Sequence, residues 1–291
     1  MYYITMQVKK HHKNNVQIIG HRGNPVSFPD NTLEGFLNAL SLGADGIEMD
    51  LVLSRDRKVV ISHEPYMDAG YMFKPNGKNI RRNEERDLLL FKMDYEQIRK
   101  FKIKSAPDPE SFENIQKPKT KPLLEEVIQV IENEVKAQRI APPTYHLELK
   151  SEVSEYNISQ PLPEEFMSVI MQVIEAFPIS HRVFISSFDP VLLNLFNENN
   201  SPLKISYLIA GGSIPEELQK LHIKPEAIAP HFSLMQEQSE VLNLLEQGYM
   251  IFSWTVNEEK MINKMIDLGV TGIITDAPEK AVKIKNRKSA T

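Results

Sequence analysis

The segment that decides the fold, residues 46–63, reads GIEMDLVLSRDRKVVISH. Its first half is rich in apolar and β-branched residues and predicts a strand. The turn from Ser54 to Lys58 is too short for a crossover to a parallel neighbour, so the strand Val59 to His63 must fold back antiparallel on the first. We therefore expect a hairpin that returns His63 towards Asp50.

Seven further strands lie along the 291-residue chain, and each strand is followed by a plausible helix. Such alternation is typical of parallel strands joined by crossover helices. Eight such units favour a closed (β/α)8 barrel, a TIM barrel, over an open sheet, because these domains run to about 250 residues. The expected strands are Val16 to Gly20, Gly46 to Leu53, Tyr145 to Lys150, Val183 to Ser187, Ile205 to Ile209, Ala227 to Pro230, Met250 to Thr255 and Gly272 to Thr275.

The expected helices carry their apolar residues on one face. The first begins after the capping residues Asp30, Asn31 and Thr32 and ends at Gly43. Similar patterns cover Leu123 to Val135, Phe166 to Phe177, Val191 to Phe196, Val241 to Leu245 and Met261 to Leu268, and a weaker one covers Glu216 to Leu221.

Residues 64–120 are far longer than the usual connection between a strand and its helix. We interpret them as an insertion in a single barrel domain that spans residues 1–291. The segment looks polar, being rich in Pro, Asn and charged residues, and its apolar residues cluster only at Tyr66, Tyr71, Met72 and Phe73. We expect this insertion to cover the pocket of the barrel.

The composition excludes several classes of function. A formal net charge of −5 argues against a nucleic-acid-binding protein, because phosphate backbones select clustered Lys and Arg. The basic clusters at residues 9–13 and 283–288 lie near the two ends and are expected to be solvated tails. The chain has no cysteine, which excludes disulfides, thiol catalysis and zinc–thiolate sites.

The sequence also bears on the membrane. No stretch approaches the length of apolar residues needed to span a bilayer, and the first residues lack the apolar run of a signal peptide. We expect a cytoplasmic enzyme without a transmembrane segment, or a periplasmic one if a leader was removed.

Acidic residues recur on one face of two successive barrel strands. Glu48 and Asp50 are two residues apart, so their side chains project together, and Glu148 on the next strand can join them. Neighbouring buried carboxylates repel, so they require a cation or must share a proton. Oxygen ligands select Mg²⁺ or Ca²⁺. The alternatives are ion pairs of these acids with Arg or Lys, including a buried pair of Glu148 with Lys150.

Histidines are expected on both sides of this acidic site. Residues 20–23, Gly-His-Arg-Gly, end the first strand, and the carboxyl end of a barrel strand is where catalytic groups are expected. Arg22 offers a planar fork for two phosphate oxygens. His21, together with the His63 returned by the hairpin, provides one base and one acid across a P–O bond.

These residues resemble those of the glycerophosphodiester phosphodiesterase family over nearly the whole barrel. The matching stretches are Ile19-Gly20-His21-Arg22-Gly23, Pro29-Asp30-Asn31-Thr32, Glu48-Met49-Asp50, His63, Leu147-Glu148-Leu149-Lys150, Ser186-Ser187-Phe188, Trp254-Thr255-Val256-Asn257 and Thr275-Asp276-Ala277-Pro278.

The resemblance implies an activity and a set of site residues. It implies cleavage of a small-molecule glycerophosphodiester into glycerol 3-phosphate and an alcohol such as choline, ethanolamine or glycerol. The implied metal ligands are Glu48, Asp50 and Glu148, and the implied acid and base are His21 and His63. Arg22 and Lys150 would bind phosphate, and Phe188 and Trp254 would line the substrate pocket.

The sequence departs from the family pattern in two places. Asp30 stands where the family usually has Glu. His63-Glu64 stands where it has His-Asp, and Pro65 to Asp68 replace an Asp-Arg-Thr-Thr stretch. These departures bear on substrate specificity near the insertion, whereas the implied catalytic residues are unaltered.

The nucleophile is either water or the neighbouring glycerol hydroxyl, and the second route passes through a cyclic phosphate. One alternative function is a phospholipase D-like enzyme acting on a sphingolipid or lysolipid, which would favour an exposed apolar rim on the insertion. Another is a catalytically silent phosphate-binding barrel, since a fold does not guarantee chemistry.

Overall fold

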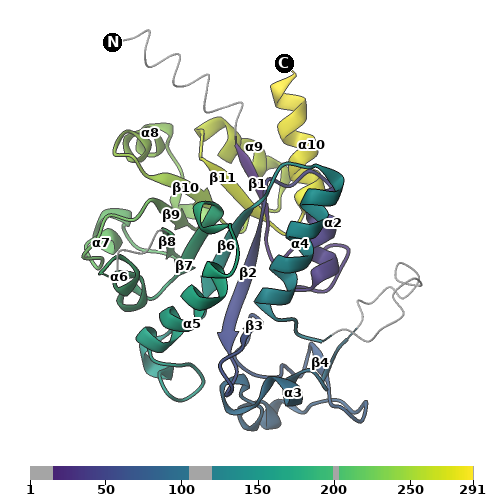
Figure 1. Ribbon diagram of the computed structural model, residues 1–291. Coiled ribbons are helices and arrows are strands. Elements are labelled where there is room, and N and C mark those ends of the chain that lie inside the picture. Colours follow the sequence, from purple (N-terminus) through teal and green to yellow (C-terminus); the bar gives the residue numbers. More distant parts are fainter. Residues whose placement is uncertain (1–15, 105–119, 199–202, 291) are drawn as a thin grey trace.

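A computed structural model describes residues 16–104, 120–198 and 203–290. Within them, eight strands pair in parallel and close on themselves, because β1 pairs with both β2 and β11. The predicted TIM barrel is confirmed (Figure 1). The strands follow the order β1 (Gln17–Gly20), β2 (Gly46–Leu53), β6 (Thr144–Leu149), β7 (Val183–Ser187), β8 (Lys204–Ile209), β9 (Ala227–Pro230), β10 (Met250–Ser253) and β11 (Gly272–Thr275).

The predicted hairpin is also present. β3 (Val59–Ile61) pairs antiparallel with the end of β2, with Leu51 opposite Ile61. β3 ends two residues earlier than expected, but the Ser62 N–H still donates to the Asp50 carbonyl at 2.9 Å. His63, the next residue, therefore lies at the same end of the barrel as Asp50.

The helices surround the barrel (Figure 1). Thr32 caps the first of them, since its Oγ1 accepts the Gly35 N–H. Several bounds differ from the expectation: α5 begins three residues earlier because Pro163 starts its first turn, α8 also begins earlier, α4 ends later, and α7 is shifted towards the N-terminus. The helices are α2 (Leu33–Ser41), α4 (Leu124–Gln138), α5 (Pro163–Glu175), α6 (Pro190–Glu198), α7 (Ile214–Leu218), α8 (Gln238–Glu246), α9 (Glu259–Leu268) and α10 (Pro278–Ser289). None of those described is long and apolar enough to cross a membrane.

The basic residues 283–288 do not form the solvated tail that the sequence suggested. They belong to α10, where Lys285 pairs with Asp45 at 2.8 Å and Lys288 pairs with Asp267 at 2.7 Å. The helix extends to Ser289, and its buried residues Ala281 and Ile284 pack against the barrel core. The other basic cluster, residues 9–13, lies outside the described residues.

Alternation along the strands separates two apolar clusters. Ile47, Met49 and Leu51 of β2 belong to the large core shared with the helices. Phe184 and Phe252 belong to a smaller cluster, together with five buried apolar residues of β1, β8, β9 and β11. His146 stacks on Phe184 with ring centroids 4.8 Å apart. Burial lowers the pKa of His146 to about 3, so its imidazole is neutral and packs as an aromatic core residue.

The described part of the insertion has its own apolar core, which the polar composition of the segment did not predict. Its elements are β4 (Met72–Phe73), η1 (Arg82–Asp87), η2 (Leu90–Lys92), α3 (Tyr95–Ile98) and β5 (Lys102–Ile103). Met67, Met72 and Ile98 pack with Val52 and Val60 of the hairpin. In Figure 1 the arrow of β2 points towards β4 and α3, which places the insertion beyond the carboxyl end of this strand. Residues 105–119 lie outside the described residues.

Candidate active site

The carboxylates of Glu48, Asp50 and Glu148 meet at the carboxyl ends of β2 and β6. The two strands pair in register, with Asp50 opposite Glu148, and one ligand oxygen from each of the three side chains lies within 4.8 Å of the others. Glu48 and Asp50 are buried, and Glu148 is nearly so. Side-chain alternation in register-matched parallel strands thus produces the acidic cluster that the sequence predicted.

Two cations lie against this acidic cluster. Arg22 Nε is 3.0 Å from Asp50 Oδ2, and Lys150 Nζ is 2.8 Å from Asp50 Oδ1 and 2.6 Å from Glu148 Oε1. Burial alone would raise the pKa of Asp50, but Lys150 and Arg22 hold it below its usual range. The ion pairs weighed as an alternative to a metal are therefore formed by Asp50 and Glu148.

Glu48 is not satisfied by these ion pairs. Its Oε2 accepts the Arg22 N–H at 2.9 Å, but its buried Oε1 has no hydrogen-bond partner among the described residues. Burial and the charge of Asp50 raise the pKa of Glu48 to about 8. A buried carboxylate oxygen without a partner is costly, and three carboxylates are a donor set for a hard cation. The residues therefore fit a divalent metal ion.

His21 is held by a second carboxylate, from the last barrel strand. Its Nδ1 lies 2.6 Å from Asp276 Oδ1, and its Nε2 lies 3.9 Å from Glu48 Oε2. Asn257 donates to the other oxygen of Asp276 at 2.5 Å and accepts the Asp276 N–H at 2.9 Å. Burial alone would lower the pKa of His21, but the Asp276 hydrogen bond and Glu48 raise it. The Asp276 carboxylate thus fixes the imidazole with Nε2 towards the acidic cluster.

We predict that Asp276→Asn lowers kcat about tenfold or more, because an amide no longer stabilises the protonated and correctly oriented imidazole. The melting temperature should change little, since Asn257 can still hydrogen-bond the new side chain. A matched control is Asp267→Asn, which alters only a surface pair with Lys288. Steady-state kinetics of both variants check the prediction, and a kcat of Asp276→Asn within about twofold of the parent contradicts it.

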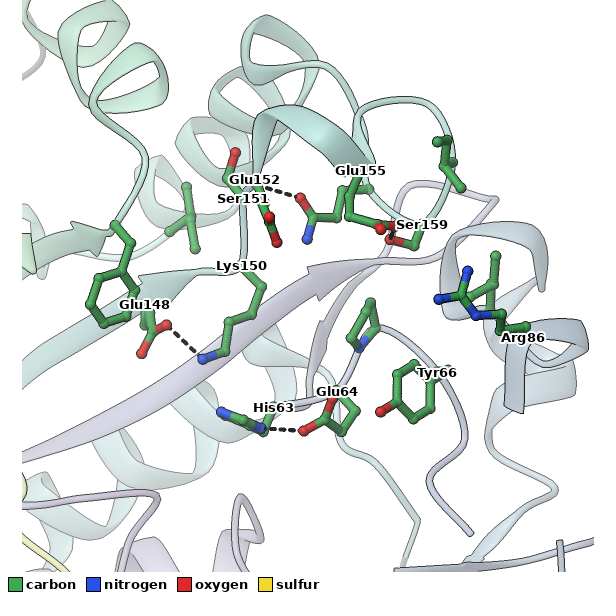
Figure 2. Close-up of a pocket in the computed structure, with 16 residues that line it drawn as sticks. His63, Glu64, Tyr66, Arg86, Glu148, Lys150, Ser151, Glu152, Glu155 and Ser159 are labelled. Carbon is green, nitrogen blue, oxygen red and sulfur yellow. Dashed lines mark hydrogen bonds and ion pairs between the residues drawn. The ribbon is translucent and has the colours of Figure 1, made fainter. Parts of the chain in front are cut away.

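His63 is oriented by the residue that departs from the family pattern. Its Nδ1 lies 2.7 Å from Glu64 Oε1, and the hydrogen bond lowers the pKa of Glu64. In Figure 2 the imidazole extends towards Glu148 and Lys150. Glu64 thus supplies a carboxylate contact to the imidazole of His63.

The loop after β1 brings Arg22 into the site through unusual backbone geometry. Arg22 has a φ of 52° and Gly23 a φ of 94°, and a Cβ on Gly23 would lie 2.6 Å from the Gly35 backbone. Only glycine fits this close approach to α2. Asp30, which replaces the usual Glu, still accepts from Arg22 Nη1 at 3.2 Å.

His63 lines three cavities. A cavity of about 120 Å³ is lined by both His21 and His63, together with Glu48, Phe188 and Trp254. The two aromatic rings meet edge to face at 5.5 Å, and Trp254 Nε1 donates to the Ala229 carbonyl. The structure thus brings all nine sequence-predicted site residues to one end of the barrel.

The other two cavities share His63 and Glu64 in their walls. One of about 740 Å³ separates the insertion from the loop that follows β6 (Figure 2). The other, of about 200 Å³, lies between Arg22 and Lys121. None of the large apolar side chains that are exposed lies in residues 64–104, so the described insertion lacks the apolar rim expected of a lipid-acting enzyme.

Sequence reasoning missed two residues that hold the site. Asp276 received no role, although barrel closure places Thr275 opposite Gly20 and hence Asp276 beside His21. Asn31 was interpreted as a helix cap, but its amide donates to Asp50 Oδ2 at 2.7 Å. Its backbone is left-handed, with a φ of 56°, a conformation that Asn tolerates better than most residues.

Comparisons with known proteins agree with this geometry. Residues 21–280 match the model of the glycerophosphoryl diester phosphodiesterase family. A glycerophosphodiester phosphodiesterase from Bacillus altitudinis is 29% identical over 271 residues, which cover 92% of this chain and 98% of that protein.

Two solved structures share the fold. A Silicibacter pomeroyi protein, named as a candidate glycerophosphoryl diester phosphodiesterase, has a TM-score of 0.79 and 25% identity, with 94% of each chain covered. An Oleispira antarctica phosphodiesterase in complex with the product sn-glycerol-3-phosphate has a TM-score of 0.72 and 22% identity, with 93% of this chain and 96% of that chain covered.

Proposed function

Because the chain belongs to the glycerophosphoryl diester phosphodiesterase family and is an enzyme of that class, we propose that it hydrolyses glycerophosphodiesters to glycerol 3-phosphate and an alcohol with a divalent cation, Mg²⁺ or Ca²⁺. Glu48, Asp50 and Glu148 hold the cation. The observation that carries this proposal is the cluster of three carboxylates, two of which, Glu48 and Glu148, line a cavity together with His21 and His63. The product named for the Oleispira antarctica enzyme supports the substrate class.

The residues around the acidic cluster neutralise the phosphodiester. Arg22 presents a guanidinium whose Nη1 pairs with Asp30 and whose Nε pairs with Asp50, and Lys150 presents an ammonium between Asp50 and Glu148. Arg22 and Lys150 can bind phosphate oxygens if another cation neutralises the carboxylates with which they now pair. A bound divalent cation supplies that compensation and stabilises charge on the phosphate.

The two histidines move the protons. One imidazole takes a proton from the nucleophile, and the other gives a proton to the departing alkoxide. Each imidazole is fixed through Nδ1, to Asp276 or to Glu64, which leaves Nε2 for the substrate. Detection of a cyclic glycerol phosphate during turnover would identify the glycerol hydroxyl as the nucleophile, and its absence on rapid quenching would favour water.

The remaining site residues shape the pocket. Phe188 and Trp254 bound the small cavity and line the substrate, with Phe188 at 43% exposure forming its outer edge. We also propose that residues 64–120 are an insertion within one barrel domain, because the described part packs its core on β2 and β3.

A panel of soluble glycerophosphodiesters assayed with each metal tests the function. We expect turnover to vanish with a chelator and to return with Mg²⁺ or Ca²⁺, and to exceed turnover of lysolipid or sphingolipid in liposomes. Absence of glycerol 3-phosphate release from every diester, with every metal, would contradict the proposal and favour a silent phosphate-binding barrel.

A further inference from the structure

A buried lysine lies behind the hairpin, outside the set of residues used above. Lys121 lies three residues before Leu124, the first residue of α4, and is only 3% exposed. Its ammonium lies 2.6 Å from Ser62 Oγ and 5.5 Å from the centre of the Tyr71 ring. It forms no ion pair with a carboxylate in the part of the chain that the structure describes.

An ammonium in such surroundings is unfavourable for folding. Burial lowers the pKa of Lys121 to about 8, and the charges of Asp68, Glu64 and Asp50 act on it only from beyond ion-pair distance. An apolar side chain of similar volume would avoid this desolvation cost. Buried ionisable groups of this kind at the wall of a site are candidates for a functional role.

The lysine acts on the turn that carries His63. The Ser62 hydroxyl accepts a hydrogen bond from Lys121 Nζ and donates one to the Glu64 carbonyl oxygen. Each of the two distances is 2.6 Å. The Ser62 N–H donates to the Asp50 carbonyl at 2.9 Å. Ser62 and Glu64, on either side of His63, are therefore joined through the Ser62 hydroxyl, which Lys121 holds from the other side.

The imidazole itself has little else to hold it. The side chain of His63 is 39% exposed, and its hydrogen bond at Nδ1 is to Glu64, the residue whose carbonyl Ser62 binds. Lys121, His63 and Arg22 also line the same cavity of about 200 Å³. The position of the imidazole consequently depends on the turn from Ser62 to Glu64.

We propose that Lys121 is a positioning residue for His63, which acts through the Ser62 hydroxyl to hold the imidazole against the substrate. The proposal rests on the catalytic role proposed for His63. The proposal thus assigns a role to a lysine that lies at the end of the insertion. Lys121 is not part of the acidic cluster and does not lie at the end of a barrel strand.

The test compares Lys121→Met, Ser62→Ala and the double variant with the parent enzyme. We expect each single variant to lower kcat about tenfold with KM within about twofold, and the double variant to be no slower than the slower single variant, because both remove one relay. The melting temperature of Lys121→Met should stay or rise, since a buried charge is removed. A purely structural lysine would instead lower the melting temperature and leave kcat of the folded enzyme unchanged.

Repeating Lys121→Met in a His63→Ala background separates this proposal from the proposed function. We expect no further loss there, because the imidazole that Lys121 positions is gone. Lys104→Met is the matched control: Lys104 donates to the Ala69 carbonyl at 2.7 Å and lies over the Phe73 ring, and its loss should leave kcat unchanged.

Three results would overturn the proposal: a kcat of Lys121→Met within about twofold of the parent, additive losses in the double variant, or an equal loss in the His63→Ala background. If Lys121→Met does not fold, Ser62→Ala replaces it in the test: its loss in kcat is measured in the parent and in the His63→Ala background, and the same outcomes apply. If His63→Ala alone loses less than about tenfold in kcat, the acid–base role proposed for His63 fails instead, whereas the proposed hydrolysis is judged separately by release of glycerol 3-phosphate.

Discussion

We expect replacement of His63 or His21 by alanine to lower kcat by about 100- to 10,000-fold, the range that a positioned proton donor or acceptor contributes. The effect follows from the geometry, since both imidazoles line one small cavity and each is fixed at Nδ1 by a carboxylate. The fold should be retained, because His63 is partly exposed and His21 packs at the rim. Steady-state kinetics and melting temperatures measure the two effects separately.

The two histidines can also be distinguished by the leaving group. A diester of a phenol with a low pKa needs no proton on departure, so the variant that lacks the acid should regain much of its rate on this substrate, whereas the variant that lacks the base should not. His181→Ala is the control, because this exposed histidine lies at the start of β7, away from the site. A loss of less than about tenfold for either active-site histidine contradicts the assignment.

Replacement of Glu48 by glutamine weakens binding of Mg²⁺ or Ca²⁺ by about 100-fold or more and lowers activity at limiting metal to a similar degree. One charged ligand of three is removed, while the shape of the side chain is kept. Isothermal titration with each metal measures the affinity. Glu279→Gln, which changes only a surface pair with Lys283, is the control. Unchanged metal affinity of Glu48→Gln would exclude Glu48 as a ligand.

In the metal-free protein, we expect the same variant to raise the thermal stability at alkaline pH. The folded-state pKa of Glu48 is raised from 4.5 to about 8. Its protonated form therefore contributes stability below pH 4.5 that is lost as pH rises through about 8. Glu48→Gln removes this loss, so without metal it should melt higher than the parent near pH 8 to 9. Thermal melts across this pH range check the sign.

The barrel and the acidic cluster could be predicted from sequence because both follow from short-range rules. Alternation places Glu48 and Asp50 on one face, and a five-residue turn forces β3 to return on β2. Contacts set by barrel closure could not be found in this way. His21 and Asp276 are 255 residues apart, and their meeting depends on the pairing of the first strand with the last.

The insertion was misread for a different physical reason. Its apolar residues are spaced irregularly, since short 3-10 turns and two-residue strands present them to the core without helical or strand periodicity. Met67, Ile80 and Phe101 are nevertheless buried together. Lys121 was unrecognised because a lysine in a charged segment is usually exposed, and only packing shows its burial.

The most direct test of the metal site is an anomalous difference map from crystals grown with Ca²⁺ and glycerol 3-phosphate. We expect one peak with oxygens of Glu48, Asp50 and Glu148 at about 2.3 to 2.6 Å, and His21 and His63 on either side of the phosphate. A peak bound by other residues, or no peak in crystals of enzyme that is active with Ca²⁺, would contradict the proposed site.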